Sequence, residues 1–250
     1  MQLFIAMSAA SLETRVQDYD AQGISSILNA YAKLHVHMPA PPQLILHLSR
    51  AITNVPTREW SAQSVGITAN SLGRLKWGGG YTPGEAESAS TAYNHLAACA
   101  IELPERRLDA QAVSNIMNAF SKPVVRKAVG ESEDVEVMCE RLLGVCVGLP
   151  SNSFTPQSVA VMARVFLGQY GVDDNDGRRG VSPVIKQKLS QVAQGLPPEG
   201  YNLQSVAMIA SAFGSSKPHE NDVVDLFRFH SSTAIFTCAS PPQPQLQTQP

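Results

Sequence analysis

Charged residues are scarce in this chain of 250 residues. The 19 Lys and Arg and the 21 Asp and Glu make up 16% of the sequence, whereas soluble domains usually carry about 25%. The formal net charge of −2 argues against a protein held on nucleic acid or on an anionic membrane by bulk charge, because such binding needs a basic surface. A local basic stripe remains compatible with this balance. The 44% of hydrophobic residues can form a buried core, which excludes wholesale disorder.

Cysteine and long apolar runs are also scarce. The four cysteines, Cys99, Cys139, Cys146 and Cys238, are too scattered for a disulfide framework and include no C-x-x-C pair. We therefore expect buried free thiols in a reducing compartment. No run of about 18 apolar residues, the length that suggests a membrane span, occurs in the sequence. The apolar segment near the N-terminus has no Lys or Arg before it, which makes it a poor signal peptide. We expect no membrane association.

Motifs of catalysis and of metal or phosphate binding are missing as well. There is no nucleophile elbow, no zinc motif and no pair of carboxylates at a defined spacing. His35 and His37 have no further ligands nearby, and the acidic stretch at 173–177 fails the calcium-loop template. The glycines at 78–80 lack the G-K-[ST] of a phosphate loop. We predict a non-catalytic protein without a metal or small-molecule cofactor, in which these three segments are loops.

An internal repeat is the main positive feature. Five segments align on a glutamine, and the spacings between successive glutamines are 41, 48, 46 and 47 residues. This is the range of two-helix solenoid repeats. The aligned glutamines are Gln22, Gln63, Gln111, Gln157 and Gln204.

Each segment carries the signals of a helix start. Two residues before each glutamine stands a side chain suited to an N-cap: Asp20, Ser61, Asp109, Thr155 and Asn202. The residue before each cap is large and apolar, and an Ile or Val follows it five positions later, as in a hydrophobic staple. The residues before the caps are Tyr19, Trp60, Leu108, Phe154 and Tyr201. The third helical position holds no Glu or Gln, so a full capping box is not expected.

We call the predicted helices that start at these caps the A helices and expect them to be about 12–15 residues long. The small residue after the staple partner suggests close helix contact; these residues are Ser25, Gly66, Ser114, Ala160 and Ala207. Second helices, the B helices, are predicted at about 42–54, 84–102, 133–148, 182–195 and 219–236, and four of them stop at an apolar residue followed by proline. A short polar loop should lead from each B helix into the next cap.

The predicted fold is all-α, an α-solenoid of stacked two-helix repeats of about 41–48 residues each. Five repeats occupy residues 19–236. Residues 1–18 look like the B helix of a partial repeat, as expected of a fragment of a longer array. The Pro- and Gln-rich tail at 237–250 should be disordered, because it cannot bury a core.

Candidate site residues follow from the helical period. Positions at the glutamine and four, seven and eleven residues beyond it lie in one narrow stripe at about 100° per residue. Two interpretations are open: the stripe binds an extended ligand, or its amides bond to neighbouring backbone and hold the repeats in register. We call this set the A-helix stripe: Gln22, Ser26, Asn29, Lys33, Gln63, Asn70, Arg74, Gln111, Asn115, Asn118, Lys122, Gln157 and Arg164.

The A segments resemble the SKWP repeats of XopAD-like type III effectors from plant-pathogenic bacteria. The first three units share the glutamine, then N-A or N-S, then a base four residues after the Asn. Ser121-Lys122-Pro123 keeps part of the name-giving motif, although no unit shows the complete tetrapeptide. The resemblance implies a virulence protein secreted into the host cell cytoplasm, where it binds a host protein. It implies no catalytic residue.

Octotricopeptide-type helical repeats are the second resemblance, because they share the P-Q-x-[VIL]-A element seen at Pro156-Gln157. That family implies recognition of single-stranded RNA in the cytoplasm or an organelle, one base per repeat. RNA recognition usually comes with a basic groove and stacking aromatic residues. The aromatic residues here are better explained as staples, so a host protein is the favoured partner and RNA the alternative.

Overall fold

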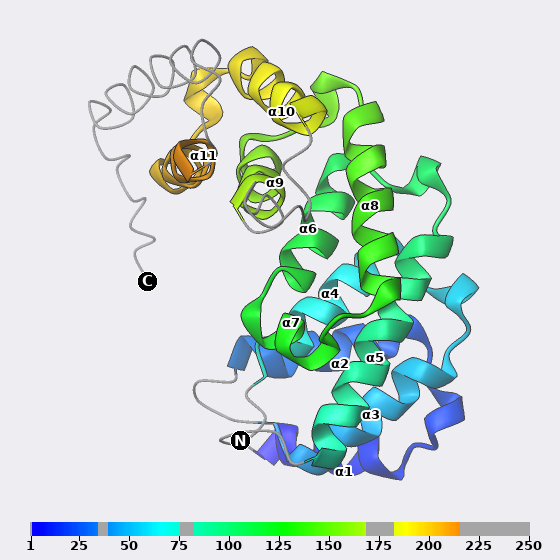
Figure 1. Ribbon diagram of the computed structural model, residues 1–250. Helices are drawn as coiled ribbons and strands as arrows, with labels where there is room; N and C mark the ends of the chain where they lie inside the picture. Colours follow the sequence, from blue (N-terminus) through cyan, green and yellow to red (C-terminus); the bar gives the residue numbers. More distant parts are fainter. Residues whose placement is uncertain (1, 35–39, 76–82, 169–182, 216–250) are drawn as a thin grey trace, which may run out of the picture. The chain divides into compact units, whose positions relative to one another are not determined.

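The computed structural model describes residues 2–34, 40–75, 83–168 and 183–215 (Figure 1). Two compact units divide the chain, Met1–Leu149 and Pro150–Pro250. Every regular element in the described residues is a helix, which confirms the all-α prediction for them. Several predictions lie outside the described residues: the B helix at 219–236, the tail at 237–250, the loops at His35 and His37, 78–80 and 173–177, and the thiol of Cys238.

All five predicted A helices are present. They are α2 (Ala21–Leu34), α4 (Ala62–Leu72), α6 (Ala110–Phe120), α9 (Pro156–Gly168) and α11 (Leu203–Ser215). The expected length is wrong for α4 and α6, which have 11 residues each. Gly73 is the C-cap of α4, and Ser121, two residues before a proline, is the C-cap of α6. The residue preceding a proline is pushed out of the helical region, so α6 cannot continue.

The predicted N-caps are confirmed at all five helix starts. In each case the cap side chain accepts a hydrogen bond from the backbone N–H of the third helical residue, which satisfies one of the donors that a helix start leaves unpaired. The donor–acceptor distances are 2.6 Å at Asp20, 3.0 Å at Ser61, 2.7 Å at Asp109, 3.1 Å at Thr155 and 2.8 Å at Asn202.

The expectation that no capping box forms is wrong at two of these starts. The backbone N–H of Ser61 donates to Oγ of Ser64, and the backbone N–H of Thr155 donates to Oγ of Ser158, both over 2.9 Å. A serine hydroxyl at the third helical position therefore accepts the bond that Glu or Gln accepts in the usual sequence pattern. Reasoning from the Glu or Gln pattern alone overlooks this serine form.

The residues predicted as staples are buried, apart from Tyr19, which is half-buried. Two of the tyrosines also bond backward along the chain. The Tyr19 hydroxyl donates to the carbonyl of Ser11 over 2.6 Å, and the Tyr201 hydroxyl donates to the carbonyl of Ala193 over 2.8 Å. Each tyrosine thus reaches eight residues back into the preceding B helix, and so ties the two helices of consecutive repeats together.

Four predicted B helices, and the helix expected near the N-terminus, match the structure to within a few residues. They are α1 (Gln2–Glu13), α3 (Pro42–Asn54), α5 (Pro83–Glu102), α8 (Glu133–Gly148) and α10 (Pro183–Gly195). The polar loops expected after them are single 3-10 turns: Val16–Asp18, Thr57–Glu59, Glu105–Arg107, Ser151–Ser153 and Pro198–Gly200. In each repeat the turn directly precedes the apolar residue that stands before the N-cap.

One helix was not predicted. Helix α7 (Pro123–Val129) starts with proline at its first position, where the missing N–H costs nothing. It ends at Gly130, which has a φ of +60°, a conformation that glycine adopts without strain. Val125 of this helix is buried, and α7 packs on α5. Seven residues are too few to show a helical period, which is why the sequence reasoning missed it.

Within the first unit, helices of the same kind pack in chain order. Helix α4 lies between α2 and α6, while α3 packs on α1 and α5, and α5 on α8 (Figure 1). The small residue predicted at Gly66 permits a close approach: a Cβ placed there would lie 3.2 Å from Cβ of Asn115 on α6. In the second unit, α9 packs on both α10 and α11. The predicted close contact at Ala207 is wrong, because this residue lies on a part of α11 that its packing on α9 leaves exposed.

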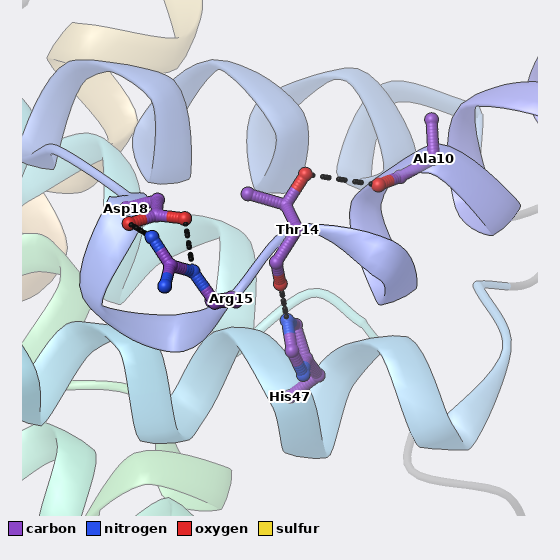
Figure 2. A network of polar contacts seen from close by, with 5 residues as sticks. All are labelled: Ala10, Thr14, Arg15, Asp18 and His47. Atoms are coloured by element: carbon purple, nitrogen blue, oxygen red, sulfur yellow. Dashed lines mark hydrogen bonds and ion pairs between the residues drawn. The ribbon is translucent and has the colours of Figure 1, made fainter.

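The ends of three B helices in the first unit are capped by side chains from the following B helix. Nε2 of His47 on α3 lies 2.9 Å from the carbonyl oxygen of Thr14 after α1, as Figure 2 shows. Nε2 of His95 on α5 lies 2.9 Å from the carbonyl oxygen of Val55 after α3. Because a carbonyl oxygen can only accept, each imidazole donates its Nε2–H. These bonds satisfy carbonyls that a helix end leaves without a partner.

Arg141 on α8 has the same role for α5. Its guanidinium donates to the carbonyl oxygen of Ala100 over 2.8 Å and to that of Leu103 over 2.5 Å. His47, His95 and Arg141 each stand eight residues before the last residue of their own helix segment, Val55, Leu103 and Leu149. The donor position is therefore repeated in the sequence, and α1, α3 and α5 are each closed by the next B helix. Close to the first of these caps, Arg15 and Asp18 form an exposed ion pair at 2.8 Å (Figure 2).

Within the described ranges, no helix combines the length and the apolar character needed to cross a bilayer.

Candidate interaction surface

The A-helix stripe lies largely at the surface. Eleven of its residues belong to the first unit, and Gln157 and Arg164 belong to α9 of the second. The exposed members are Gln22, Ser26, Lys33, Gln63, Arg74, Gln111, Asn115 and Gln157. The half-buried members are Asn29, Asn70, Asn118, Lys122 and Arg164. The glutamine is exposed in every repeat, as the helical period requires of residues opposite the buried staple partners.

The structure brings the first-unit members together because α2, α4 and α6 pack side by side. Two contacts fix the register between α4 and α6. The ammonium group of Lys122 donates to the carbonyl oxygen of Asn70 over 3.1 Å and also to its side-chain oxygen. The close approach of Gly66 to Asn115 lies further along the same two helices. Helices α4 and α6 are therefore offset along one another, since Asn70 stands seven residues after its aligned glutamine and Lys122 eleven residues after its own.

Hydrogen bonds divide the stripe into engaged and open positions. Asn70 and Lys122 bond to each other, and the Gln111 amide donates to Oδ1 of Asn115 over 2.9 Å within α6. Among the described residues, the exposed amides of Gln22 and Gln63 form no side-chain hydrogen bond. A carboxamide has both donors and an acceptor, so these two positions can bond the main chain or side chains of another molecule.

The first-unit A helices carry no carboxylate. None of the residues of α2, α4 and α6 is Asp or Glu. A base stands eleven residues after each aligned glutamine: Lys33 in the last turn of α2, Arg74 after α4 and Lys122 after α6. The acidic residues of the neighbouring B helices are Glu85, Glu87, Glu102, Glu133, Asp134, Glu136 and Glu140. Helices α5 and α8 are thus the acidic ones, whereas α2, α4, α6 and the B helix α3 contain no carboxylate.

The thiols and the buried tyrosine in the described residues are not arranged as a reactive site. Cys99, Cys139 and Cys146 are buried and form no disulfide, as predicted. Burial, together with a smaller effect of the nearby Glu102 carboxylate, raises the pKa of Cys99 to about 12 and so favours the neutral thiol. Burial also raises the pKa of Tyr201. Since the thiolate is the nucleophile, Cys99 is poorly suited to covalent chemistry. The described residues contain no group of three or more His, Cys, Asp or Glu placed to hold a metal ion.

Sequence reasoning missed the role of His47, His95 and Arg141, which act between helices. The signal was present, since these donors stand at the same distance before the ends of successive B helices. It was hidden because His and Arg differ in shape and share only the ability to donate a hydrogen bond. The sequence also did not indicate that Lys122, a stripe residue, binds Asn70 of the preceding repeat.

Comparison of the chain with models of protein families, with curated proteins and with solved structures finds no match. The resemblance to SKWP repeats and to octotricopeptide-type repeats therefore rests on the sequence motifs alone.

Proposed function

We propose that this chain is a non-catalytic interaction protein, an α-solenoid of two-helix repeats whose A-helix stripe binds a host protein. The observation that carries the proposal is the exposure of equivalent polar residues on α2, α4 and α6, which pack on one another in chain order. Stacked repeats present the same face of every unit to one extended surface. Such a surface is suited to a ligand that is itself extended.

The solenoid arrangement is supported by the repetition of local devices from unit to unit. Every repeat begins with a capped A helix preceded by a 3-10 turn. In the first unit α1, α3 and α5 are also each closed by a donor on the next B helix. Contacts between nearest neighbours of this kind are what holds repeat proteins together. The effector role, with delivery into the host cytoplasm, is supported by the SKWP-like motifs of the first three repeats.

Protein is a better fit than single-stranded RNA as the ligand. Sequence-tolerant RNA binding relies on exposed aromatic rings on which bases stack. In the described residues, the large hydrophobic side chains that are exposed are all aliphatic, and Tyr31, Trp60 and Phe120 are buried. Carboxamides that bond to a peptide main chain need no such platform. RNA remains the second candidate because Lys33 and Arg74 are exposed bases. Neither α2, which contains Lys33, nor α4, which Arg74 follows, contains a carboxylate.

The test of this function is a comparison of captured partners. One variant combines Gln22→Ala, Gln63→Ala and Gln111→Ala, three exposed stripe positions that should be tolerated by the fold. The control combines Gln43→Ala and Asn54→Ala, exposed positions on the B helix α3. Plant extract is passed over the wild type and both variants, and the captured proteins are quantified by mass spectrometry and then purified for titration.

A protein that binds the wild type and the control but is lost from the stripe variant supports the proposal. The same set of proteins on all three baits contradicts it. Binding of labelled single-stranded RNA at low salt, lost in the stripe variant, would assign the surface to RNA instead.

A further inference from the structure

The two exposed bases of the first-unit A helices have no acidic counterpart near them in sequence. Lys33 lies in the last turn of α2, and Arg74 follows α4 by two residues. A base at a helix C-terminus is favourable for the helix dipole, yet this interaction leaves the charged group in solvent. Among the described residues, neither Lys33 nor Arg74 forms an ion pair. We call this pair the basic edge.

The third base of the row has a different use. Lys122 is half-buried and donates to Asn70, so its ammonium group is held between two helices. A purely structural role would be expected to recur in each repeat, and it does not recur at Lys33 and Arg74, which are exposed. The basic edge therefore offers two charges at equivalent positions of neighbouring helices that the fold itself leaves open.

The spacing of the basic edge suits an extended polypeptide. Packed helices lie about 8–10 Å apart, and α2 packs directly on α4. An extended chain advances about 3.3 Å per residue. Carboxylates about three residues apart on such a chain would meet Lys33 and Arg74 together. Asn29, one helical turn before Lys33, is half-buried, and its carboxamide has both donors and an acceptor for a main chain.

We propose that the basic edge binds an extended acidic segment of a partner protein, with carboxylates about three residues apart on Lys33 and Arg74. This inference rests on the proposed function and specifies the chemistry of the partner. The charge complementarity is local: α2 and α4 contain no carboxylate, whereas α5 and α8 carry seven acidic residues that would repel the same segment. The sign of the charges therefore favours α2 and α4 over α5 and α8 as the docking side.

The experiment measures binding of labelled peptides to the full chain by fluorescence anisotropy at low salt. The acidic peptide has two Glu residues separated as E-x-x-E in a Gly/Ser host, and the comparison peptides carry Gln in their place or have the two Glu adjacent. The test variant is Lys33→Gln with Arg74→Gln. The control is Arg50→Gln with Arg58→Gln, two exposed bases on α3 and on the 3-10 turn that follows it.

The expected result is binding of the E-x-x-E peptide that is about five- to tenfold weaker with the Lys33 and Arg74 variant, the effect of two exposed ion pairs. The control should bind like the wild type, the Gln peptide should bind weakly, and added salt should weaken the interaction. The inference is overturned if the Gln peptide binds equally well, if the control loses as much affinity, or if no peptide binds at millimolar concentration. Oligouridine binding that needs Lys33 and Arg74, without acidic-peptide binding, also overturns it.

Failure here is distinguishable from failure of the proposed function. If the captured host protein depends on Gln22, Gln63 and Gln111 but not on Lys33 and Arg74, the stripe binds a partner that is not acidic. If it depends on neither set, the function itself is contradicted.

Discussion

Lys122 and Asn70 lie 52 positions apart in the sequence and join two neighbouring repeats. The ammonium group donates to the carbonyl oxygen of Asn70 over 3.1 Å and to its side-chain oxygen as well. Asn70 belongs to the last turn of α4, so the bond also satisfies a carbonyl near the end of that helix. Residues of one stripe thus have two different uses, since this pair holds neighbouring helices while Gln22 and Gln63 face solvent.

The first prediction concerns this pair. Lys122→Met keeps the aliphatic stem but removes the donor, and should lower the free energy of unfolding by about 1–2 kcal/mol, because a hydrogen bond from a charged group is lost and the Asn70 oxygens lose a partner. Urea unfolding followed by circular dichroism measures it. Lys127→Met, an exposed base on α7, is the control and should stay within about 0.5 kcal/mol of the wild type. Equal stability of the two variants would contradict the role of Lys122.

The second prediction compares two glycines inside helices. A methyl group added at Gly144 on α8 would meet open space, whereas a Cβ at Gly66 would lie 3.2 Å from Cβ of Asn115. Replacing an exposed helical glycine by alanine gains about 1 kcal/mol, so Gly144→Ala should stabilise the protein. Gly66→Ala should gain at least about 1 kcal/mol less stability than Gly144→Ala. The reason is that Cβ of Asn115 cannot move unless helix α6 moves with it. Equal gains in urea unfolding would show that α4 and α6 are not in close contact.

The third prediction concerns the cap on α3. His95→Ala removes the shorter of the two side-chain bonds to the carbonyl of Val55, which also accepts from Nε1 of Trp60 over 3.4 Å, and should cost up to about 1 kcal/mol of stability, together with some lost packing. His95→Gln retains an N–H donor and should recover part of the loss. Hydrogen exchange followed by mass spectrometry should show faster exchange in the last turn of α3 for the alanine variant, with α9 as the internal reference. Unchanged exchange in α3 would argue against the cap.

The fourth prediction concerns alkaline pH. The pKa of Cys99 is raised from 9.0 to about 12 by burial and by Glu102, so the folded protein keeps a proton that the unfolded chain releases above about pH 9. Stability conferred by the neutral thiol is therefore present below pH 9 and is lost as the pH rises toward 12. The loss has an upper limit of about 1.4 kcal/mol per pH unit. Urea unfolding measured from pH 8 to pH 11 should show a shallower decline for Cys99→Ala.

The same burial protects the thiol from reagents. Under native conditions Cys99 should react with iodoacetamide far more slowly than in urea, since it is buried and its thiolate is disfavoured. Peptide mapping by mass spectrometry reads this residue separately from the other cysteines. Rapid native labelling of Cys99 would contradict its position in α5.

Local signals explain why much of the fold could be predicted from the sequence. A cap such as Asp109 and the N–H of Ala112 that it accepts are three residues apart, and proline after Val55 or Leu103 ends a helix regardless of the rest of the fold. Helix starts and stops were therefore found to within a few residues. The capping boxes at Ser61 and Thr155 were missed because the expected partner was Glu or Gln.

Contacts between repeats could not be predicted in the same way. The bonds of Lys122 to Asn70 and of His95 to Val55 join residues 52 and 40 positions apart, and they depend on how far one helix is shifted along the next. No local pattern encodes that shift. For the candidate site, the helical period gave the exposed face correctly at Gln22, Gln63 and Gln111. It could not distinguish Lys122, which is engaged, from Lys33, which is open.

In the first unit, donors on one B helix bond the carbonyls at the end of the preceding B helix. This pattern limits which duplications or deletions of sequence leave every such carbonyl with a donor. A segment cut at successive 3-10 turns, as from Thr57–Glu59 to Glu105–Arg107, contains both a donor, His95, and a new helix end that needs one, at Leu103. Duplication or deletion of that whole segment leaves donors and acceptors equal in number. Duplication or deletion of part of a repeat, for example a segment that includes His95 but not Leu103, leaves donors and carbonyls unequal in number. Recombination by whole repeats is thus the change in length that this pattern of hydrogen bonds tolerates best.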